Sequence, residues 1–346
     1  MVRRILFALL ALAPLVIVLH YVADLDETGE FVLSALALVP LAWLIGEATE
    51  HAAEHTGPQI GGFLNATFGN APELIIALIA VNQGLTEVVR GSLSGSVIGN
   101  LLLVLGFSLV FGGDGEIDRK SSLMSFALIG IATLLFLVVA IPGWDGEPER
   151  DSLAKLSIPV SILLLVVYVA GTWYSLRSNR AQHLSGDENV EGWSLRRSLG
   201  VLGIATLATA LVAEILVSSL EVFAENAGLS DFFVAAVIVA VVGNAAEHGG
   251  AIVVAHRGKI KLAVEIALSS AAQVAVFLIP AVTLLAWLID PLALSFRPVE
   301  MLALGASLAL VVVLLYPGRS SRGRGVALIA AYVGIAALFF YSGDRF

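Results

Sequence analysis

Apolar residues fill long runs along most of this chain, and short polar stretches separate the runs. A helix of about 20 apolar residues is needed to cross the hydrocarbon core of a bilayer. We interpret about eleven of the runs as membrane spans, namely residues 5–23, 31–49, 61–81, 86–111, 121–141, 156–177, 197–220, 232–255, 262–289, 298–316 and 326–342. This pattern predicts an all-α polytopic membrane protein embedded in a lipid bilayer.

The composition supports the same class. Of the 346 residues, 58% are hydrophobic and only 14% are charged, which is too little polar surface for a soluble protein of this length. The chain contains no cysteine, which excludes disulfides and thiolate metal sites. The net charge of −9 reflects acidic loops, and no basic patch indicates binding to nucleic acid.

The basic residues predict the orientation in the membrane. With the N-terminus inside, fourteen of the 19 Lys and Arg residues fall in cytoplasmic segments. We therefore expect a cytoplasmic N-terminus and an external C-terminus, in a prokaryotic plasma (inner) membrane. The first run also fits a signal peptide, but no small-residue cleavage site follows it, so we expect a retained helix.

A short motif occurs twice, 174 positions apart. Gly69-Asn70-Ala71-Pro72-Glu73 lies within one apolar run, and Gly243-Asn244-Ala245-Ala246-Glu247 lies within another. Upstream at the same offset, Glu47 matches Glu221. Ionisable residues inside membrane spans are costly and mark functional sites by default. Two such motifs predict a duplicated transporter with one shared cation site.

The repeat divides the chain into four parts. These are an N-terminal transmembrane helix at 1–25, a first repeat of five helices at 31–177, a polar cytoplasmic linker at 178–196 and a second repeat of five helices at 197–342. Because each repeat has an odd number of spans, the second enters the membrane from the opposite face. The two repeats are thus expected to be inverted, with broken Glu-bearing helices meeting at the midplane.

The motif has two interpretations. Asn-x-x-Glu fits a helix capping box, in which the two side chains satisfy backbone N–H groups. Here the cap would lie at membrane depth, where broken backbone occurs only if it is buried in protein or lines a wet cavity. We favour ion binding, because carboxylates, amide oxygens and freed carbonyls would form a cluster of hard oxygen ligands.

Calcium is the cation that best suits such a cluster, since it accepts six to eight oxygen ligands in flexible geometry. The predicted ligands are Glu73 and Glu247, and the wider site comprises Gly69, Asn70, Gly243, Asn244, Ser96, Asn100, Ser270 and Gln273. A carboxylate that binds either a proton or the cation makes the two ligands compete, which is sufficient for cation/proton exchange. No cofactor is expected beyond the transported Ca²⁺ and H⁺.

The motif residues resemble a known family. Leu44 to Glu50 and Gly61 to Leu74 are similar to the first α-repeat of the calcium/proton exchangers, and Val242 to His248 with Ser269 to Gln273 are similar to the second. The family belongs to the cation/calcium exchanger superfamily. The resemblance implies an eleven-span fold and assigns Glu73 and Glu247 as the paired ion-binding glutamates. The sodium-coupled members carry Thr-Ser where this chain has Gly-Asn, which implies proton coupling.

Other polar residues each allow more than one role. Glu47, Glu50 and Glu54, together with Glu221, could attract cations to a vestibule or form a simple helix-end charge cluster. His51 and His55 have the i, i+4 spacing that can bind zinc. His248 could relay protons or hydrogen-bond a neighbouring span. Runs of small residues at 92–96 and 267–272 indicate close helix packing.

The sequence leaves three other functions open. The protein could be a passive cation channel, an exchanger for another divalent cation or, less consistently with a duplicated motif, a zinc-dependent intramembrane hydrolase. A channel would normally build its carboxylate ring by oligomerisation. We favour a transporter over an enzyme, and the sequence does not predict the oligomeric state.

Overall fold

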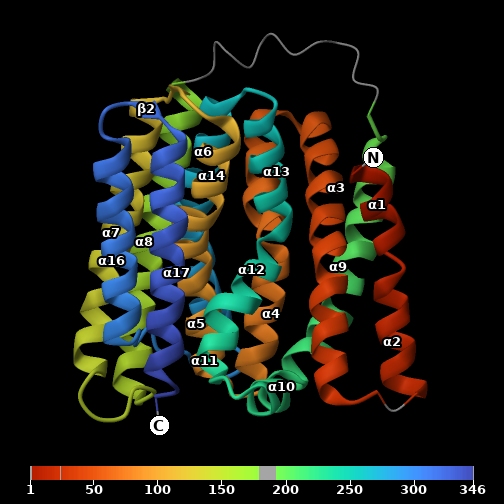
Figure 1. Cartoon of the computed structure of the whole chain (residues 1–346). Coiled ribbons are helices and arrows are strands. Elements are labelled where there is room, and N and C mark those ends of the chain that lie inside the picture. The colour runs from red at the N-terminus through yellow and green to blue at the C-terminus, as the bar shows by residue number, and fades with distance from the viewer. Residues whose placement is uncertain (1, 24, 179–191, 346) are drawn as a thin grey trace.

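A computed structural model describes residues 2–23, 25–178 and 192–345; within them, the side chains of residues 2–4, 57–63, 65, 66, 174–178 and 246–248 are not described. The described chain is nearly all helical (Figure 1). The first half contains α1 (Val2–Leu9), α2 (Leu12–Val22), α3 (Glu27–Gly69), α4 (Ala71–Asn82), α5 (Thr86–Ile98), η1 (Gly99–Val104), α6 (Leu105–Gly112), α7 (Arg119–Gly143) and α8 (Asp151–Ser178).

The second half contains α9 (Leu195–Ser218), α10 (Leu220–Ala227), α11 (Asp231–Phe233), η3 (Val234–Val239), α12 (Ala240–Gly243), α13 (Ala245–His256), α14 (Ile260–Gln273), η4 (Val274–Leu278), α15 (Ile279–Ala286), α16 (Pro298–Leu315) and α17 (Arg322–Ser342). The η segments are π-helical turns. Two short strands, β1 (Gly115–Glu116) and β2 (Arg319–Ser320), pair antiparallel, with Gly115 opposite Ser320.

The membrane character predicted from the sequence is confirmed. Among the described residues, nine helices are long and apolar enough to cross a bilayer, and a tenth span results if α10 and the bent segment α11–α12 are counted together. The chain is therefore an integral membrane protein of the all-α polytopic class. The expected single helix over 5–23 is divided into α1 and α2 at Leu10 and Ala11.

Both motif-bearing runs are broken where the sequence predicted. Asn70 separates α3 from α4, and Asn244 separates α12 from α13. The helices that follow, α4 and α13, are both 12 residues long and begin 174 positions apart. The starts of α5 and α14, and those of α6 and α15, show the same offset. The sequence repeat is thus repeated in the helix boundaries.

The two ends of the molecule carry different segments (Figure 1). α1 begins at the end that carries β2, whereas α10, α11 and the C-terminus lie at the opposite end. We call these the β2 end and the α11 end. α4 occupies the half towards the α11 end and α13 the half towards the β2 end. The helices after the two breaks therefore extend in opposite directions from the middle of the molecule.

Small residues allow α5 to approach η3 closely, as the sequence indicated for residues 92–96. A Cβ atom placed on Gly95 would lie 2.0 Å from the backbone oxygen of Ala236, so no side chain fits there. One turn earlier, a Cβ on Gly91 would lie 3.2 Å from the Phe232 ring. This contact brings the polar end of α5 towards the break at Asn244.

Candidate functional site

Glu73 lies in the first turn of α4 and is buried, with 7% of the residue exposed. Its side chain contacts the backbone at the other motif, because a Cβ atom on Gly243 would lie 3.1 Å from Glu73 Cγ and 3.8 Å from Oε1. Any larger residue at position 243 would press on this carboxylate. The two motifs, 174 residues apart in the sequence, therefore meet in space.

Asn244 connects the second motif to the first half of the chain. Its Nδ2 group donates to Ser96 Oγ at 2.7 Å and to the Ala240 carbonyl at 2.8 Å. Its Oδ1 accepts from Asn100 Nδ2 at 3.0 Å. All three side chains are buried, with Ser96 2%, Asn100 0% and Asn244 1% exposed. These bonds fix the amide across the α5–α12 contact.

The capping interpretation of the motif is wrong for the asparagines. Neither Asn70 nor Asn244 makes a side-chain capping hydrogen bond to the helix that follows it. The Asn244 amide instead reaches across to α5 and back to the preceding helix. The asparagines therefore do not act as side-chain caps, and the ion-binding interpretation of the motif stays a prediction.

The cluster also presents an acceptor to its interior. Asn100 Oδ1 is buried and accepts no hydrogen bond from any described residue. A buried acceptor of this kind calls for a partner, and an ion or water is the usual one. Asn100 lies in η1, and Gln273 lies directly before η4. π-Helical turns are rare and are found frequently at functional sites. No sequence signal revealed them.

The remaining predicted site residues differ in how far the structure describes them. Asn70 is buried, Gly69 directly precedes the break, and Ser270 and Gln273 lie on α14, which packs against η1. Ser270 is buried and Gln273 is half-buried. The side chains of Glu247 and His248 lie outside the described residues, so their predicted roles remain predictions.

Two predicted vestibule residues of α3, Glu47 and Glu54, contact a histidine of the same helix. On α3, His51 Nδ1 contacts Glu54 Oε2 at 3.2 Å, and His51 Nε2 lies 3.9 Å from Glu47 Oε1. His55 Nε2 instead contacts the Trp193 carbonyl at 2.7 Å. In the part of the chain that is described, no group of three or more His, Asp or Glu residues could hold a metal ion. The two histidines thus have separate partners. Glu50 and Glu221 are exposed.

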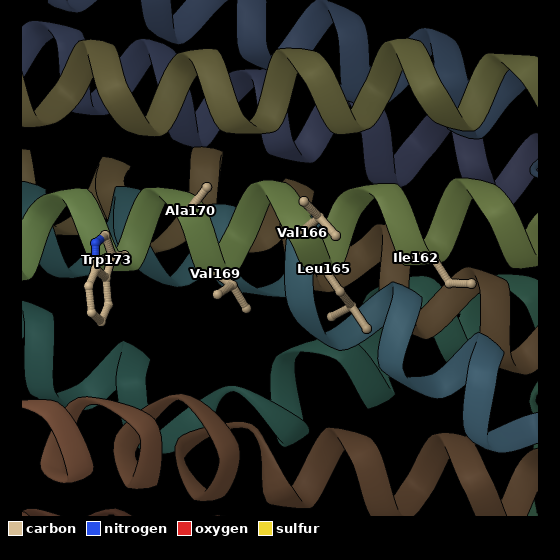
Figure 2. Close-up of a pocket in the computed structure, with 6 residues that line it drawn as sticks. All are labelled: Ile162, Leu165, Val166, Val169, Ala170 and Trp173. Atoms are coloured by element: carbon tan, nitrogen blue, oxygen red, sulfur yellow. The ribbon is translucent and has the colours of Figure 1, made fainter.

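A pocket of about 660 Å³ elsewhere in the molecule is not an ion site. Its described lining consists of six α8 residues, Ile162, Leu165, Val166, Val169, Ala170 and Trp173. Figure 2 shows these side chains along α8. The lining contains no carboxylate or amide, so it offers no oxygen ligands to a cation.

Sequence reasoning missed a second buried polar group near the α11 end. We define the Arg90 cluster as the cations Arg90, Arg297 and Arg345 with the carboxylates Glu87, Glu149 and Glu300. Arg90 is 1% exposed and contacts both Glu87, at 2.7 Å, and Glu149. Glu300 is 0% exposed; it accepts from Ser94 Oγ at 2.7 Å and from the Arg297 backbone N–H at 2.8 Å. The available signal was the position of Arg90 and Glu300 close to the ends of apolar runs.

Comparisons with known proteins agree with this architecture. The family model described as sodium/calcium exchanger protein matches residues 27–177 and again residues 197–341. The chain belongs to that family. The resemblance to the cation/calcium exchanger superfamily is thereby confirmed, and the family is one of membrane transporters.

Individual relatives cover nearly the whole chain. A Ca(2+)/H(+) antiporter named ChaA from Bacillus subtilis is 36% identical, and the alignment covers 98% of this chain and 99% of the relative. A Ca(2+)/H(+) antiporter from Aphanothece halophytica is 34% identical over 98% of this chain and 97% of its own length. The solved structure titled native YfkE has a TM-score of 0.85 and 33% identity, and covers 97% of this chain and 99% of its own.

Proposed function

We propose that this protein exchanges Ca²⁺ for H⁺ across the membrane at the site around Glu73 and Glu247. The observation that carries the proposal is the meeting of the two motifs in the buried interior, where the Glu73 side chain contacts Gly243 and Asn244 binds Ser96 and Asn100. Relatives at about 35% identity are named Ca(2+)/H(+) antiporters, which supports the choice of ions.

The coupling follows from the chemistry of a carboxylate. A buried Glu is stable when it holds a proton or when it neutralises a cation, and unstable when it is ionised and empty. A site that changes its access only when loaded therefore carries calcium in one direction and protons in the other. Glu73 and Glu247 supply the two charges that match Ca²⁺, and the neighbouring amides and hydroxyls supply neutral oxygens. The site needs no resident cofactor.

Inverted repeats would provide the alternating access, and three observations support them. The helix boundaries recur at an offset of 174, the family model matches each half separately, and α4 and α13 lie in opposite halves of the molecule (Figure 1). In such transporters, rocking of one element against another exposes a central site to each side in turn.

The orientation also forms part of the proposal. The β2 end carries the exposed basic residues Arg119, Lys120, Arg257, Lys259, Lys261, Arg319 and Arg322. By the positive-inside rule this end faces the cytoplasm, which places the C-terminus outside. Because bacterial relatives share the plan, we place the protein in a bacterial plasma membrane. Since the chain has no cysteine, labelling an engineered Ser321→Cys with an impermeant reagent tests this, and labelling from outside would contradict it.

Transport in proteoliposomes tests the function directly. We expect an imposed proton gradient to drive calcium uptake, and collapse of that gradient to stop it. A sodium gradient should have no effect. Calcium flux that ignores the proton gradient would indicate a channel, and flux that requires sodium would place the chain among the sodium-coupled exchangers.

A further inference from the structure

The last residues of the chain contact the starts of two helices that lead to the ion site. Arg345 Nη1 lies 3.7 Å from Glu87 Oε1, in the first turn of α5. Asp344 Oδ1 accepts the Phe232 backbone N–H at 3.0 Å, at the start of the α11–α12 segment. The far ends of these two segments carry Ser96 and Asn244, which bind each other.

Arg297 and Arg345 hold the tail in place. Arg297 Nη1 donates to the Gly343 carbonyl at 2.7 Å, and its Nη2 donates to the Ser342 carbonyl at 3.1 Å. Arg345 Nη1 donates to the Ser295 carbonyl at 2.9 Å, and its Nη2 to the Gly143 carbonyl at 3.2 Å. Four backbone carbonyls thus accept from two guanidinium groups, which favours one conformation of residues 342–345 over an exposed, frayed terminus.

Phe232, which Asp344 contacts, is enclosed on several sides. The residue is 0% exposed. The Arg297 guanidinium lies 4.4 Å above the Phe232 ring, and the Phe339 ring lies 5.1 Å away in an edge-to-face arrangement. The Phe232 backbone N–H is one of the groups that a helix start leaves without an intrahelical partner. Asp344 satisfies this group from a position 112 residues away in the sequence.

We infer that Asp344 and Arg345 are positioning residues for ion exchange. They join the ends of α5 and of the α11–α12 segment that lie at the α11 end. The opposite end of α5 carries Ser96 and leads to Asn100, and the opposite end of α12 leads to Asn244. Gly95 in α5 and Ala236 in η3 touch backbone to backbone with no side chain between them. The relative position of the two segments at the α11 end is therefore transmitted along their length. The tail therefore sets the geometry of the amide and hydroxyl oxygens at the site. The inference rests on the proposed function, since it assigns the tail a role in that exchange.

The test compares Asp344→Ala with Asp344→Asn in proton-driven calcium uptake by proteoliposomes. The alanine variant cannot accept the Phe232 N–H, whereas the asparagine variant still can. We expect Asp344→Ala to raise the KM for calcium roughly fivefold or more, the lower end of usual couplings between distant sites, with little change in maximal rate. Asp344→Asn should restore a KM close to that of the unchanged protein.

Asp118→Ala is the matched control. Asp118 also accepts backbone N–H groups at a helix start, from Lys120 and Ser121, but it begins α7 at the β2 end. A merely structural loss should lower the amount of protein in both alanine variants and leave the calcium KM unchanged. An unchanged KM in a well-inserted Asp344→Ala protein overturns the inference, as does an equal rise in Asp118→Ala.

If Asp344→Ala does not accumulate, Arg345→Gln carries the same test, because it weakens the contacts to Ser295 and Gly143 while keeping Asp344. If neither variant accumulates, the tail acts on folding and the inference is wrong. Failure of the proposed function would look different, since the unchanged protein would then show no proton-driven calcium uptake at all.

Discussion

The proposed ion site and the Arg90 cluster differ in how their charges are balanced. The proposed ion site contains two glutamates and no Lys or Arg among its ten predicted residues. The Arg90 cluster contains three arginines and three glutamates, so its charges balance within the protein. A group that is neutralised internally has no need of an ion, whereas an acidic group without internal cations requires one. Charge balance thus distinguishes the proposed ligand-binding site from a group that holds helices together.

The largest expected effect is on transport, from Glu73→Gln. The substitution keeps the shape of the side chain but removes one charge and one proton acceptor from the site. Proton-driven calcium uptake in proteoliposomes should fall to background. The variant should still insert into the membrane, with the same midpoint of thermal unfolding as the unchanged protein. Glu247→Gln should behave in the same way. Near-normal uptake by either well-expressed variant would disprove the assignment of the site.

The largest expected effect on stability comes from the Arg90 cluster. Arg90→Met removes the arginine partner of Glu149 and leaves Glu87 with only its longer contacts to Arg297 and Arg345. Because both carboxylates are only partly buried, we expect a cost of about 3 kcal/mol of unfolding free energy, the lower end for a broken buried pair. We expect low amounts in the membrane and a lower midpoint of thermal unfolding. Glu149→Gln should cost less, since the Glu149 side chain is 29% exposed and keeps contact with solvent. Equal stability of Arg90→Met and the unchanged protein would show that the cluster contributes nothing to folding.

Asn244→Ala should have a smaller effect on calcium transport than Glu73→Gln. It removes the hydrogen bonds to Ser96 and Asn100 without changing any charge. Because such groups orient the ligands around them, we expect the KM for calcium in the same uptake assay to rise roughly tenfold. Ser96→Ala loses only one of the two bonds, and a larger effect from it than from Asn244→Ala would contradict this arrangement.

The smallest expected effect is at the β2 end, where Lys261 pairs with Asp118 at 3.1 Å. Hydrogen bonding from Lys261 lowers the pKa of Asp118. The pair therefore stabilises the fold above the ordinary Asp pKa of about 4 and loses that contribution as the pH falls through the lowered value. Both side chains are exposed, so Lys261→Ala should cost less than about 1 kcal/mol at pH 7 in thermal unfolding. A larger cost would mean that this pair resembles the Arg90 cluster.

The sequence predicted the membrane class, the two helix breaks and several residues that meet at the site, because each leaves a local signal. Gly-Asn within an apolar run breaks a helix regardless of how that helix packs. A carboxylate inside a membrane span is too costly to be retained without a function. The Arg90 cluster left a weaker signal, since charged residues near the ends of apolar runs, such as Arg90 and Glu300, usually lie at the membrane surface. Their burial depends on how α5, α16 and the tail pack, which is a property of the tertiary structure. The π-helical turns at η1 and η4 were missed for the same reason.

The contact between Gly95 and Ala236 limits how this protein can move. Side chains between two helices can change rotamer and allow one helix to slide along the other, but two backbones in direct contact have no such freedom. We therefore expect α5 and η3 to move together. For the proposed exchange, we expect the motion that opens the site to each side in turn to leave the α5–η3 contact intact.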